Sequence, residues 1–450
     1  MKYKFRNTVE AGIVLKALCG IFLLVITQPA SSQIQLSLEQ AVSLAREGDP
    51  WLTGSRHQEE AVQAQSTAAG ELPDPVVSLG IANLPIDSFH IGQEHMTQFK
   101  VGVRQDFPRG DSRLLKRQQL DEMSGQHPYL RQNRMAGVTV EVSNLWLETY
   151  RNREAIRLIE RDRFLFEHLV NVAQSNYTSA VGETRQQDLL RAQLELTRLE
   201  DRLTLLQEQQ ETSRAELNEW LQGAEVKDFV LSTGLPTLSL VQQGLAEEGE
   251  FSDKQLNDAL LEHPLIKSYE QKIMASHTEI QLSRQKYKPR WGLNTSYGYR
   301  NDDPLGNDRS HFFSMDVTFD LPLFTSRRQD KEVQSAIAEA EAIKTDKTLA
   351  LRSMRADFES AQARLHRLDQ RKTLYEDRLL QEIHDHAEAS LTAYTNDDGE
   401  FSDVVRARIA ELNANIDFLN INIDRLKTIA ELNYFLVASV DGQAREIPHE

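Results

Sequence analysis

The sequence predicts a mixed α and β fold that is mainly α, with long coiled-coil helices and four short strands arranged in two copies of one unit. Three observations lead to this prediction. Proline is rare and clustered and glycine is sparse through long stretches, which favours long helices. Short stretches in which apolar and polar residues alternate predict strands. The same features recur in the same order in both halves of the chain, which indicates an internal duplication.

The two copies cover residues 36–222 and 251–437. Each opens with a short amphipathic helix that ends near a proline, Pro50 in the first copy and Pro264 in the second. Each then runs as a helix to a second proline break, through two alternating stretches, and along a very long helical tract that turns once at a glycine. Because agreement in so many ordered features is improbable by chance, a tandem duplication is the simplest explanation.

The expected boundaries follow from this pattern. Residues 1–32 are expected to be a signal peptide, 223–250 a small mixed insert midway along the helices, and 438–450 a C-terminal tail near that insert. In the first repeat (33–222) we expect helices at 37–72, 112–178 and 183–222 and strands at 76–83 and 99–107. In the second (251–437) we expect helices at 253–288, 326–393 and 400–437 and strands at 291–300 and 312–321.

The N-terminal segment has the layout of a secretory signal. Four basic residues precede the apolar run 17–26, and small residues follow it. The run is too short to span a bilayer, which needs about 20 residues. Lipidation at Cys19 is disfavoured because Cys19 follows Leu18 and precedes most of the apolar run. Removing 1–32 would take away four basic residues and one acidic residue, changing the net charge from −17 to about −20.

The remaining chain would have no cysteine, and therefore no disulfide and no thiolate metal ligand. Its acidity argues against a nucleic-acid partner, since phosphate binding requires a basic surface. The sequence contains no nucleophile elbow, phosphate loop or zinc signature. His384 and His386 would lie on different faces of a helix, which disfavours a shared metal ion. We therefore expect no catalytic residues, no cofactor, no metal site and no enzymatic activity.

The alternating stretches carry the most information. Their apolar members are Val77, Leu79 and Ile81; Phe99, Val101, Val103 and Phe107; Trp291, Leu293, Thr295, Tyr297 and Tyr299; and Phe313, Met315, Val317, Phe319 and Leu321. One apolar face and one small or charged face are typical of a strand between lipid and water. At about nine residues, each stretch has the length that a tilted strand needs to cross a bilayer.

The alternative is a pair of surface hairpins half-buried on a soluble core. The remaining elements, however, are helices that already form their own coiled-coil stripes, and the leader predicts export. Four strands cannot close a barrel, and open strand edges are not tolerated in lipid. We therefore expect several copies of the chain to share one transmembrane β-barrel.

The helices predict a long wall. Residues 112–178 would form about 100 Å of helix at about 1.5 Å per residue, and 326–393 a similar length. The return helices are shorter by nearly half, and an opening helix stacked end to end on each would restore that length. Leucine-rich stripes run along both return helices at Leu189, Ala192, Leu196, Leu199, Leu203, Leu206, Ala215 and Leu217, and at Leu412, Ile416, Leu419, Ile423, Leu426, Ile429, Leu432 and Leu436. Such stripes indicate helix packing rather than cofactor binding.

The ordered set of motifs resembles the TolC family of outer-membrane efflux proteins over nearly the whole chain after residue 32. It comprises the two repeats, Leu72-Pro73 before the first strand, Phe107-Pro108 and Leu321-Pro322-Leu323-Phe324 after later strands, and the turns Tyr177–Gly182 and Tyr394–Gly399. The resemblance implies a homotrimer with a 12-stranded barrel in outer-membrane lipid, each chain giving four strands, and a helical tunnel in the periplasm. It also implies a periplasmic adaptor and an inner-membrane pump of the RND type as partners.

The resemblance also assigns site residues. Val181, Gly182 and Glu183 match the family's tip motif for adaptor contact, whereas the second turn, at Gly399, departs from that motif. Asp403 matches the first aspartate of the family's pore constriction, and Arg406 stands where the second aspartate is usual. A ring of three Asp403 carboxylates is implied, with Arg406 forming a salt-bridge latch between chains or helices.

A finer resemblance concerns residues 72–85 and 105–110, which are similar to the strand regions of channels paired with heavy-metal cation pumps. The expected function is therefore the exit duct of a tripartite efflux system for heavy-metal cations. The alternatives are a drug or protein-export channel of the same family, and a soluble periplasmic coiled-coil adaptor or scaffold. A secreted enzyme would need a convergent polar site, which the sequence does not show.

Overall fold

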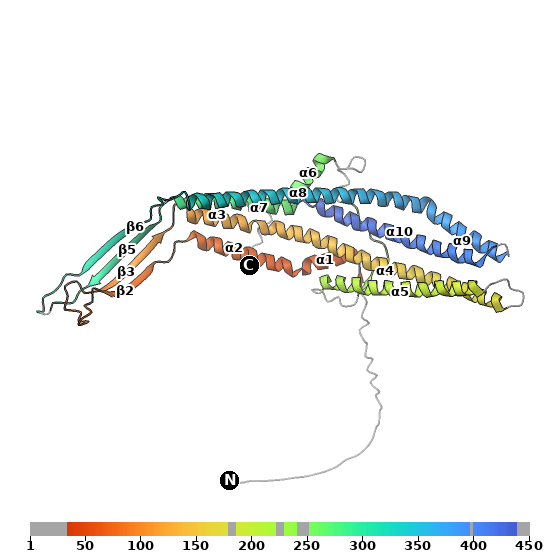
Figure 1. The fold of residues 1–450 in the computed structure, drawn as a ribbon, viewed down its shortest axis with the longest axis horizontal. Helices are drawn as coiled ribbons and strands as arrows, with labels where there is room; N and C mark the ends of the chain where they lie inside the picture. The colour runs from red at the N-terminus through yellow and green to blue at the C-terminus, as the bar shows by residue number, and fades with distance from the viewer. Residues whose placement is uncertain are drawn as a thin grey trace, which may run out of the picture.

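The structure, a computed structural model, describes residues 34–178, 186–221, 229–240, 252–303, 305–396 and 399–438. The expected signal peptide lies outside the described residues, as do most of the tail and much of the insert. The described chain is elongated, with long antiparallel helices ending in a four-stranded sheet at one end (Figure 1).

The first repeat contains β1 (Ile34–Leu36), α1 (Leu38–Gly48), α2 (Pro50–Gly70), β2 (Val76–Ala82), β3 (Gln98–Phe107), α3 (Ser112–Ser124), α4 (Gln126–Thr178) and α5 (Gln186–Leu221). After it come β4 (Phe229–Leu231), α6 (Asp253–Leu261), α7 (Pro264–Arg284), β5 (Trp291–Tyr299), β6 (Phe312–Phe319), α8 (Gln329–Leu374), α9 (Leu380–Thr395) and α10 (Phe401–Phe435). The mainly helical fold with four alternating strands, predicted from sequence, is confirmed.

The two repeats begin with the same local devices. Ser37 and Ser252 each form a capping box with a glutamine three residues later, which satisfies the first amide groups of α1 and α6. Pro50 and Pro264 occupy the first turn of α2 and α7, where the missing N–H of proline costs nothing. Both opening helices therefore stop and restart at equivalent positions.

The structure differs from the predicted helices in three places. The tract expected at 112–178 is divided at Gly125 into α3 and α4. The tract expected at 326–393 begins at Gln329 and contains a π-helical turn at Tyr375–Leu379. The opening tracts are each divided in two before their prolines. A π-turn holds one extra residue in an otherwise continuous helix, so hydrophobic periodicity does not mark it.

The strands β1 and β4 pair in parallel, with Ile34 opposite Phe229 and Leu36 opposite Leu231. The indole Nε1 of Trp146, on α4, donates a hydrogen bond to the carbonyl oxygen of Leu36 at 3.1 Å. A short strand was expected near residues 226–230, but β1 was not, because three residues are too few to show alternation. The pair anchors the start of the described chain midway along the helices.

The helices pack through the two predicted stripes. Leu199 and Leu203 of α5 lie in one buried cluster with Leu412 and Ile416 of α10. Ile423 and Leu426 of α10 join a second cluster around Trp146, α1 and the β1–β4 pair, and Leu432 and Leu436 join a third with α6, α7 and α8. In Figure 1, α2 and α1 lead into the line of α5, and α7 leads into the line of α10. This is the end-to-end arrangement expected from the helix lengths.

Among the described residues, no helix has the length and apolar character required to pass through a membrane.

Candidate membrane-facing sheet and channel tip

The sheet joins the two repeats edge to edge in the order β2-β3-β5-β6, and all its pairings are antiparallel. The central pair, β3 with β5, runs from Phe99 opposite Tyr299 to Phe107 opposite Trp291. Strands β2 and β6 form the two edges and have no further neighbour in the described chain. Each edge therefore presents a row of unpaired backbone groups.

The register places the predicted apolar residues of all four strands on one face. Across the strands they form rows: Val77, Val103, Thr295 and Met315; Leu79, Val101, Tyr297 and Phe313; and Ile81, Phe99 and Tyr299. No helix of the described chain covers this face, and Leu79 and Phe313 are 78% and 72% exposed. A contiguous exposed apolar surface of this size marks contact with lipid or another protein.

The opposite face consists mainly of small and charged residues. Gly102, Gly292 and Gly298 lie on it, with Ser78 and Ser296 beside them. A Cβ atom on Gly102 would lie 2.7 Å from the Ser78 hydroxyl oxygen, so the Ser78 side chain would have to rotate to make room for it. Small residues on this face and large ones on the other are the arrangement that a strand between water and lipid requires.

Arg109 links the end of β3 to the second repeat. Its guanidinium NH1 group donates to the carbonyl oxygens of Lys286 at 3.2 Å and Lys288 at 2.8 Å, and its NH2 group forms an ion pair with Asp320. The link holds the base of the sheet against the end of α7. Sequence reasoning missed it because residues so far apart in the chain carry no shared local signal.

The predicted constriction residues lie in the first turns of α10. Asp403 and Arg406 form an ion pair within this helix, with side chains 52% and 70% exposed. The Arg406 Nε atom also donates to the Ser402 carbonyl oxygen at 3.4 Å. Within the described chain, Arg406 thus contacts Asp403 and Ser402 of its own helix, and the latch to another helix or chain stays a prediction.

Of the predicted tip residues, Val181, Gly182 and Glu183 lie outside the described residues. Gly399 lies within the described residues, two positions before Phe401, the first residue of α10. A Cβ atom on Gly399 would lie 2.9 Å from the Tyr394 amide nitrogen and 3.1 Å from the Ala393 carbonyl carbon. Because these atoms are backbone and cannot rotate away, the turn requires glycine at this position.

An ionic network joins α9 to α10 near this turn. The buried Arg408 guanidinium binds Glu411 at 2.8 Å and Glu388 at 2.6 Å, and His384 Nδ1 lies 2.6 Å from Glu411. The hydrogen bond with Glu411 raises the pKa of His384. Burial would raise the pKa of Glu411, but hydrogen bonds with His384 and Arg408 outweigh it and lower that pKa. His384 thus belongs to a helix–helix link.

No three histidine, cysteine or acidic side chains in the described ranges come together in a geometry suited to a metal ion.

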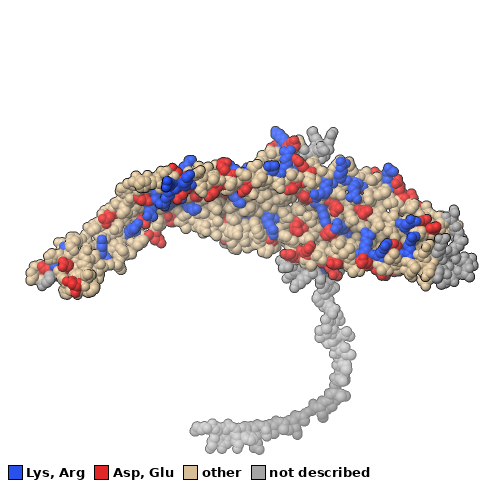
Figure 2. All heavy atoms as spheres, viewed as in Figure 1, with Lys and Arg blue, Asp and Glu red and all other residues tan. Residues whose placement is uncertain are grey.

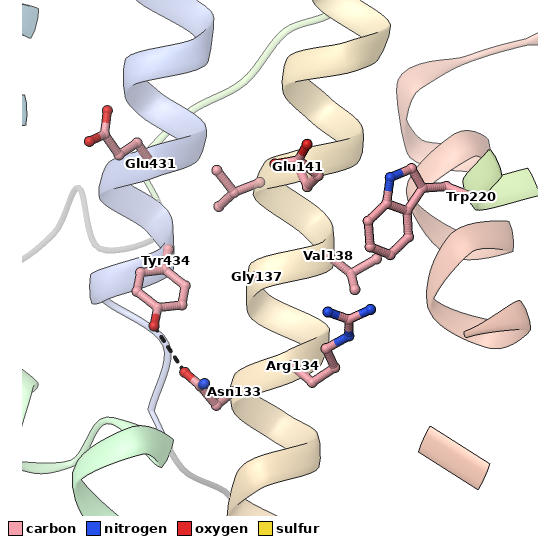
Figure 3. A pocket seen from close by; sticks show the side chains of 9 residues that line it. Asn133, Arg134, Gly137, Val138, Glu141, Trp220, Glu431 and Tyr434 are labelled. Carbon is pink, nitrogen blue, oxygen red and sulfur yellow. Dashed lines mark hydrogen bonds between the residues drawn. The ribbon is translucent and has the colours of Figure 1, made fainter. Parts of the chain in front are cut away.

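A groove of about 570 Å³ lies midway along the helices, between α4 and α10 (Figure 3). The Tyr434 hydroxyl donates to the Asn133 side-chain oxygen at 3.0 Å at one end. On the other side of α4, the Arg134 guanidinium stands 5.2 Å from the Trp220 ring and binds the buried Asp49 carboxylate at 2.7 Å. These contacts tie α4 to the end of α5 and the start of α2, so they stabilise the wall.

The second repeat matches a known protein family. Residues 255–436, most of the second repeat, match the family model described as outer membrane efflux protein. No curated protein matches the chain by sequence.

The fold matches solved structures over nearly its whole length. A membrane protein from Pseudomonas aeruginosa has a TM-score of 0.74 at 14% identity, covering 89% of this chain and 92% of its own. The CmeC outer membrane channel of Campylobacter jejuni has a TM-score of 0.72 at 14% identity, covering 96% of this chain and 94% of its own. The open-state MtrE outer membrane channel of Neisseria gonorrhoeae has a TM-score of 0.71 at 17% identity, covering 89% and 88%. At these identities the likeness establishes a shared fold.

Proposed function

We infer that this chain, whose residues 255–436 match the outer membrane efflux protein family, forms the exit duct of a tripartite efflux system. On this proposal the protein lies in the outer membrane, with its helices in the periplasm, and the match to the outer membrane efflux protein family supports this location. The predicted resemblance to this family is thereby confirmed. The particular cargo, the partners and the roles of single residues are proposals.

The observation that carries the proposal is the sheet. It presents one apolar face that no helix of the described chain covers, and a second face of small and charged residues in the same register. If the apolar face lies in lipid, both edge strands must be paired. Each unsatisfied backbone group at an edge would cost several kcal/mol in hydrocarbon. We propose that three chains close one barrel of about 12 strands, each β6 pairing with the β2 of a neighbour.

At the other end of the molecule, the tip is proposed to meet a periplasmic adaptor. Val181, Gly182 and Glu183 are proposed to contact it, and Gly399 to shape the second turn beside them. Asp403 is proposed to line a constriction at this end, where three carboxylates would favour cations. The Arg406 side chain, paired with Asp403 in its own helix, would reduce that charge until it moves to another partner.

For the cargo we propose heavy-metal cations delivered by an inner-membrane pump of the RND type. The support is the resemblance of residues 72–85 and 105–110 to metal-pump channels, together with the acidic character of the chain, whose net charge is −17. A negative wall concentrates cations without selecting among them. The same architecture would serve a drug or protein-export pump, which deletion of the gene and growth on metal salts or antibiotics would distinguish.

Cell fractionation with native mass measurement in detergent tests the proposed duct. We expect a heat-sensitive trimer in the outer-membrane fraction that conducts ions in planar bilayers. A soluble monomer without channel activity would contradict the proposal and favour a periplasmic scaffold. The Arg406→Ala variant tests the constriction: its single-channel conductance and antibiotic leakage should differ from those of the unmodified channel, and identical values would exclude the latch.

A further inference from the structure

A pocket of about 570 Å³ lies where the sheet meets the helices. Its walls come from α3, α7 and the segments that lead out of β3 and into β5. The charged side chains that line it are Arg109, Lys116, Lys286 and Arg290 together with Asp106 and Glu279. Figure 2 shows lysine and arginine atoms gathered at this junction, in contrast to the mixed charges farther along the helices.

The acidic groups around the pocket are largely paired. Asp106 lies 3.0 Å from the Arg104 guanidinium, and Asp320 is paired with Arg109. These pairs neutralise both carboxylates and fix the pocket wall. Glu279 remains as the unpaired acid in the lining.

Two cations of the pocket keep their charge available. The Lys116 ammonium donates to the neutral Gln119 side chain at 2.7 Å. The Arg290 guanidinium is exposed and makes no ion pair or hydrogen bond within the described chain, although it is within electrostatic range of Asp320, whose carboxylate accepts the Arg290 backbone N–H. A guanidinium and an ammonium that line one pocket supply several N–H donors of the kind that bind a carboxylate or phosphate group.

The strand register shows on which face of the sheet the pocket lies. Asp106 alternates with Phe107 and so belongs to the polar face. Arg290 precedes Trp291, which is on the apolar face, and the ladder continues past it through the bond from the Asp320 amide to the Arg290 carbonyl oxygen at 3.2 Å. If the apolar face meets lipid, as the proposed function requires, the pocket opens into the channel, once in each of three chains.

We propose that this pocket is an anion-binding subsite on the cargo path, in which Arg290 and Lys116 bind a carboxylate or phosphate group of the passing solute. The proposal rests on the proposed duct, which sets the polar face toward the lumen. The proposal restricts the cargo to solutes that carry an anionic group, because the positively charged Arg290 and Lys116 side chains would not bind a bare metal cation. A metal bound by a carboxylate-bearing ligand, or another solute with an anionic group, would be held there before it enters the sheet region.

The test is the ion selectivity of purified trimers in planar bilayers of neutral phosphatidylcholine under a KCl gradient. The double variant Arg290→Gln/Lys116→Gln should lower the chloride-to-potassium permeability ratio by about twofold or more, since charged rings set selectivity. Inorganic phosphate added to the unmodified channel should reduce its conductance, and the double variant should lose this effect. Arg290→Lys, which keeps the charge, should retain most of both properties.

The matched control is Lys254→Gln/Arg371→Gln, which removes two exposed cations on α6 and α8 away from the pocket. An unchanged permeability ratio and unchanged phosphate block in the Arg290/Lys116 variant would overturn the proposal. An equal shift in the control would also overturn it, because the effect would then be one of overall charge. If phosphatidylglycerol membranes, rather than soluble phosphate, produce the Arg290-dependent effect, the side chains face lipid headgroups and the lumenal subsite is wrong.

Trimer assembly on unheated gels is checked first for every variant. If the double variant does not assemble, the comparison of Arg290→Gln with Arg290→Lys decides the question by the same measurements. If the unmodified protein formed no channel, the proposed duct itself would be contradicted. Failure of the duct can therefore be distinguished from failure of the anion-binding subsite.

Discussion

The side chain of His263 joins the start of α7 to the end of α10 through Tyr434. The His263 Nε2 atom lies 3.0 Å from the Tyr434 carbonyl oxygen, and the two rings meet edge to face with centroids 4.9 Å apart. His263 Nδ1 accepts the amide hydrogen of Leu265 at 3.2 Å and so caps α7. Both bonds together require the neutral ring with its proton on Nε2.

Burial lowers the pKa of His263 to about 4, opposed by the hydrogen bond to Tyr434. Because the unfolded chain binds this proton near pH 6.5, the contribution of the neutral ring is full above that pH and is lost as pH falls toward about 4. We expect a loss of about 3 kcal/mol across this range. His263→Asn, which retains a capping side chain, should flatten the pH dependence of thermal unfolding between pH 6.5 and 4. An equally steep profile in the variant would rule out His263 as its source.

Removing the central arginine of the α9–α10 network should loosen the hairpin near the tip. Arg408→Ala leaves Glu388 and Glu411 without their shared cation. The expected cost is somewhat below the roughly 3–5 kcal/mol of a fully buried pair, because Glu388 is half exposed. Hydrogen exchange across α9 should speed up accordingly.

The control for this variant is Arg378→Ala, which breaks an exposed i,i+4 pair between the π-helical turn and Glu382 at the start of α9. Its cost should stay below about 1 kcal/mol. Equal exchange rates in the two variants would mean that the network adds nothing to the hairpin.

A charge on the apolar face of the sheet should prevent membrane assembly. Val101 lies near the middle of β3, opposite Tyr297 and Leu79. A lysine at such a position costs about 2–4 kcal/mol at the bilayer midplane, and a trimer would bear this cost three times. We expect Val101→Lys to remove the heat-sensitive trimer from the outer-membrane fraction. Ser314→Lys, on the polar face of β6, should assemble normally, and loss of assembly in both variants would argue against lipid contact for one face only.

Two glycines should respond to alanine in opposite directions. Gly399→Ala brings a methyl group against backbone atoms of Ala393 and Tyr394, and overpacking of this kind costs about 1–3 kcal/mol. Gly137→Ala, in the interior of α4, meets no atom within 4 Å and should stabilise the helix by about 0.5–1 kcal/mol. Thermal unfolding in detergent should show a lower unfolding temperature for Gly399→Ala and a higher one for Gly137→Ala. A neutral Gly399→Ala would show that the turn can rearrange.

The strands and the packing of the long helices could be predicted from the sequence, because both depend on periodic burial of apolar residues. Val101 and Tyr297 lie on one apolar face, as their alternation predicted, and Leu199 and Ile416, from the two predicted stripes, belong to one buried cluster. The duplication also indicated equivalent elements in each half, since the same local devices recur at Ser37 and Ser252.

The contacts that hold the ends of the elements together were not predictable in the same way. The Arg109–Asp320 pair joins residues from different repeats, and nothing local distinguishes Arg109 from its basic neighbours. The Asp403–Arg406 pair has ordinary i,i+3 spacing and could have been anticipated within one helix, whereas the sequence reading assigned Arg406 to a link between helices or chains. His384 pairs with a glutamate on the next helix, a partner that only the hairpin geometry supplies.

The parallel pairing of β1 with β4 has a consequence for the order of folding. All helices of the first repeat lie between Leu36 and Leu231, so bringing these strands together closes a very long loop before any of their own hydrogen bonds form. The strands gain a surface to pack on once α4 presents Trp146, whose indole bonds the Leu36 carbonyl. The strand pair should therefore be among the last contacts to form during folding, after the first repeat has assembled its own helices.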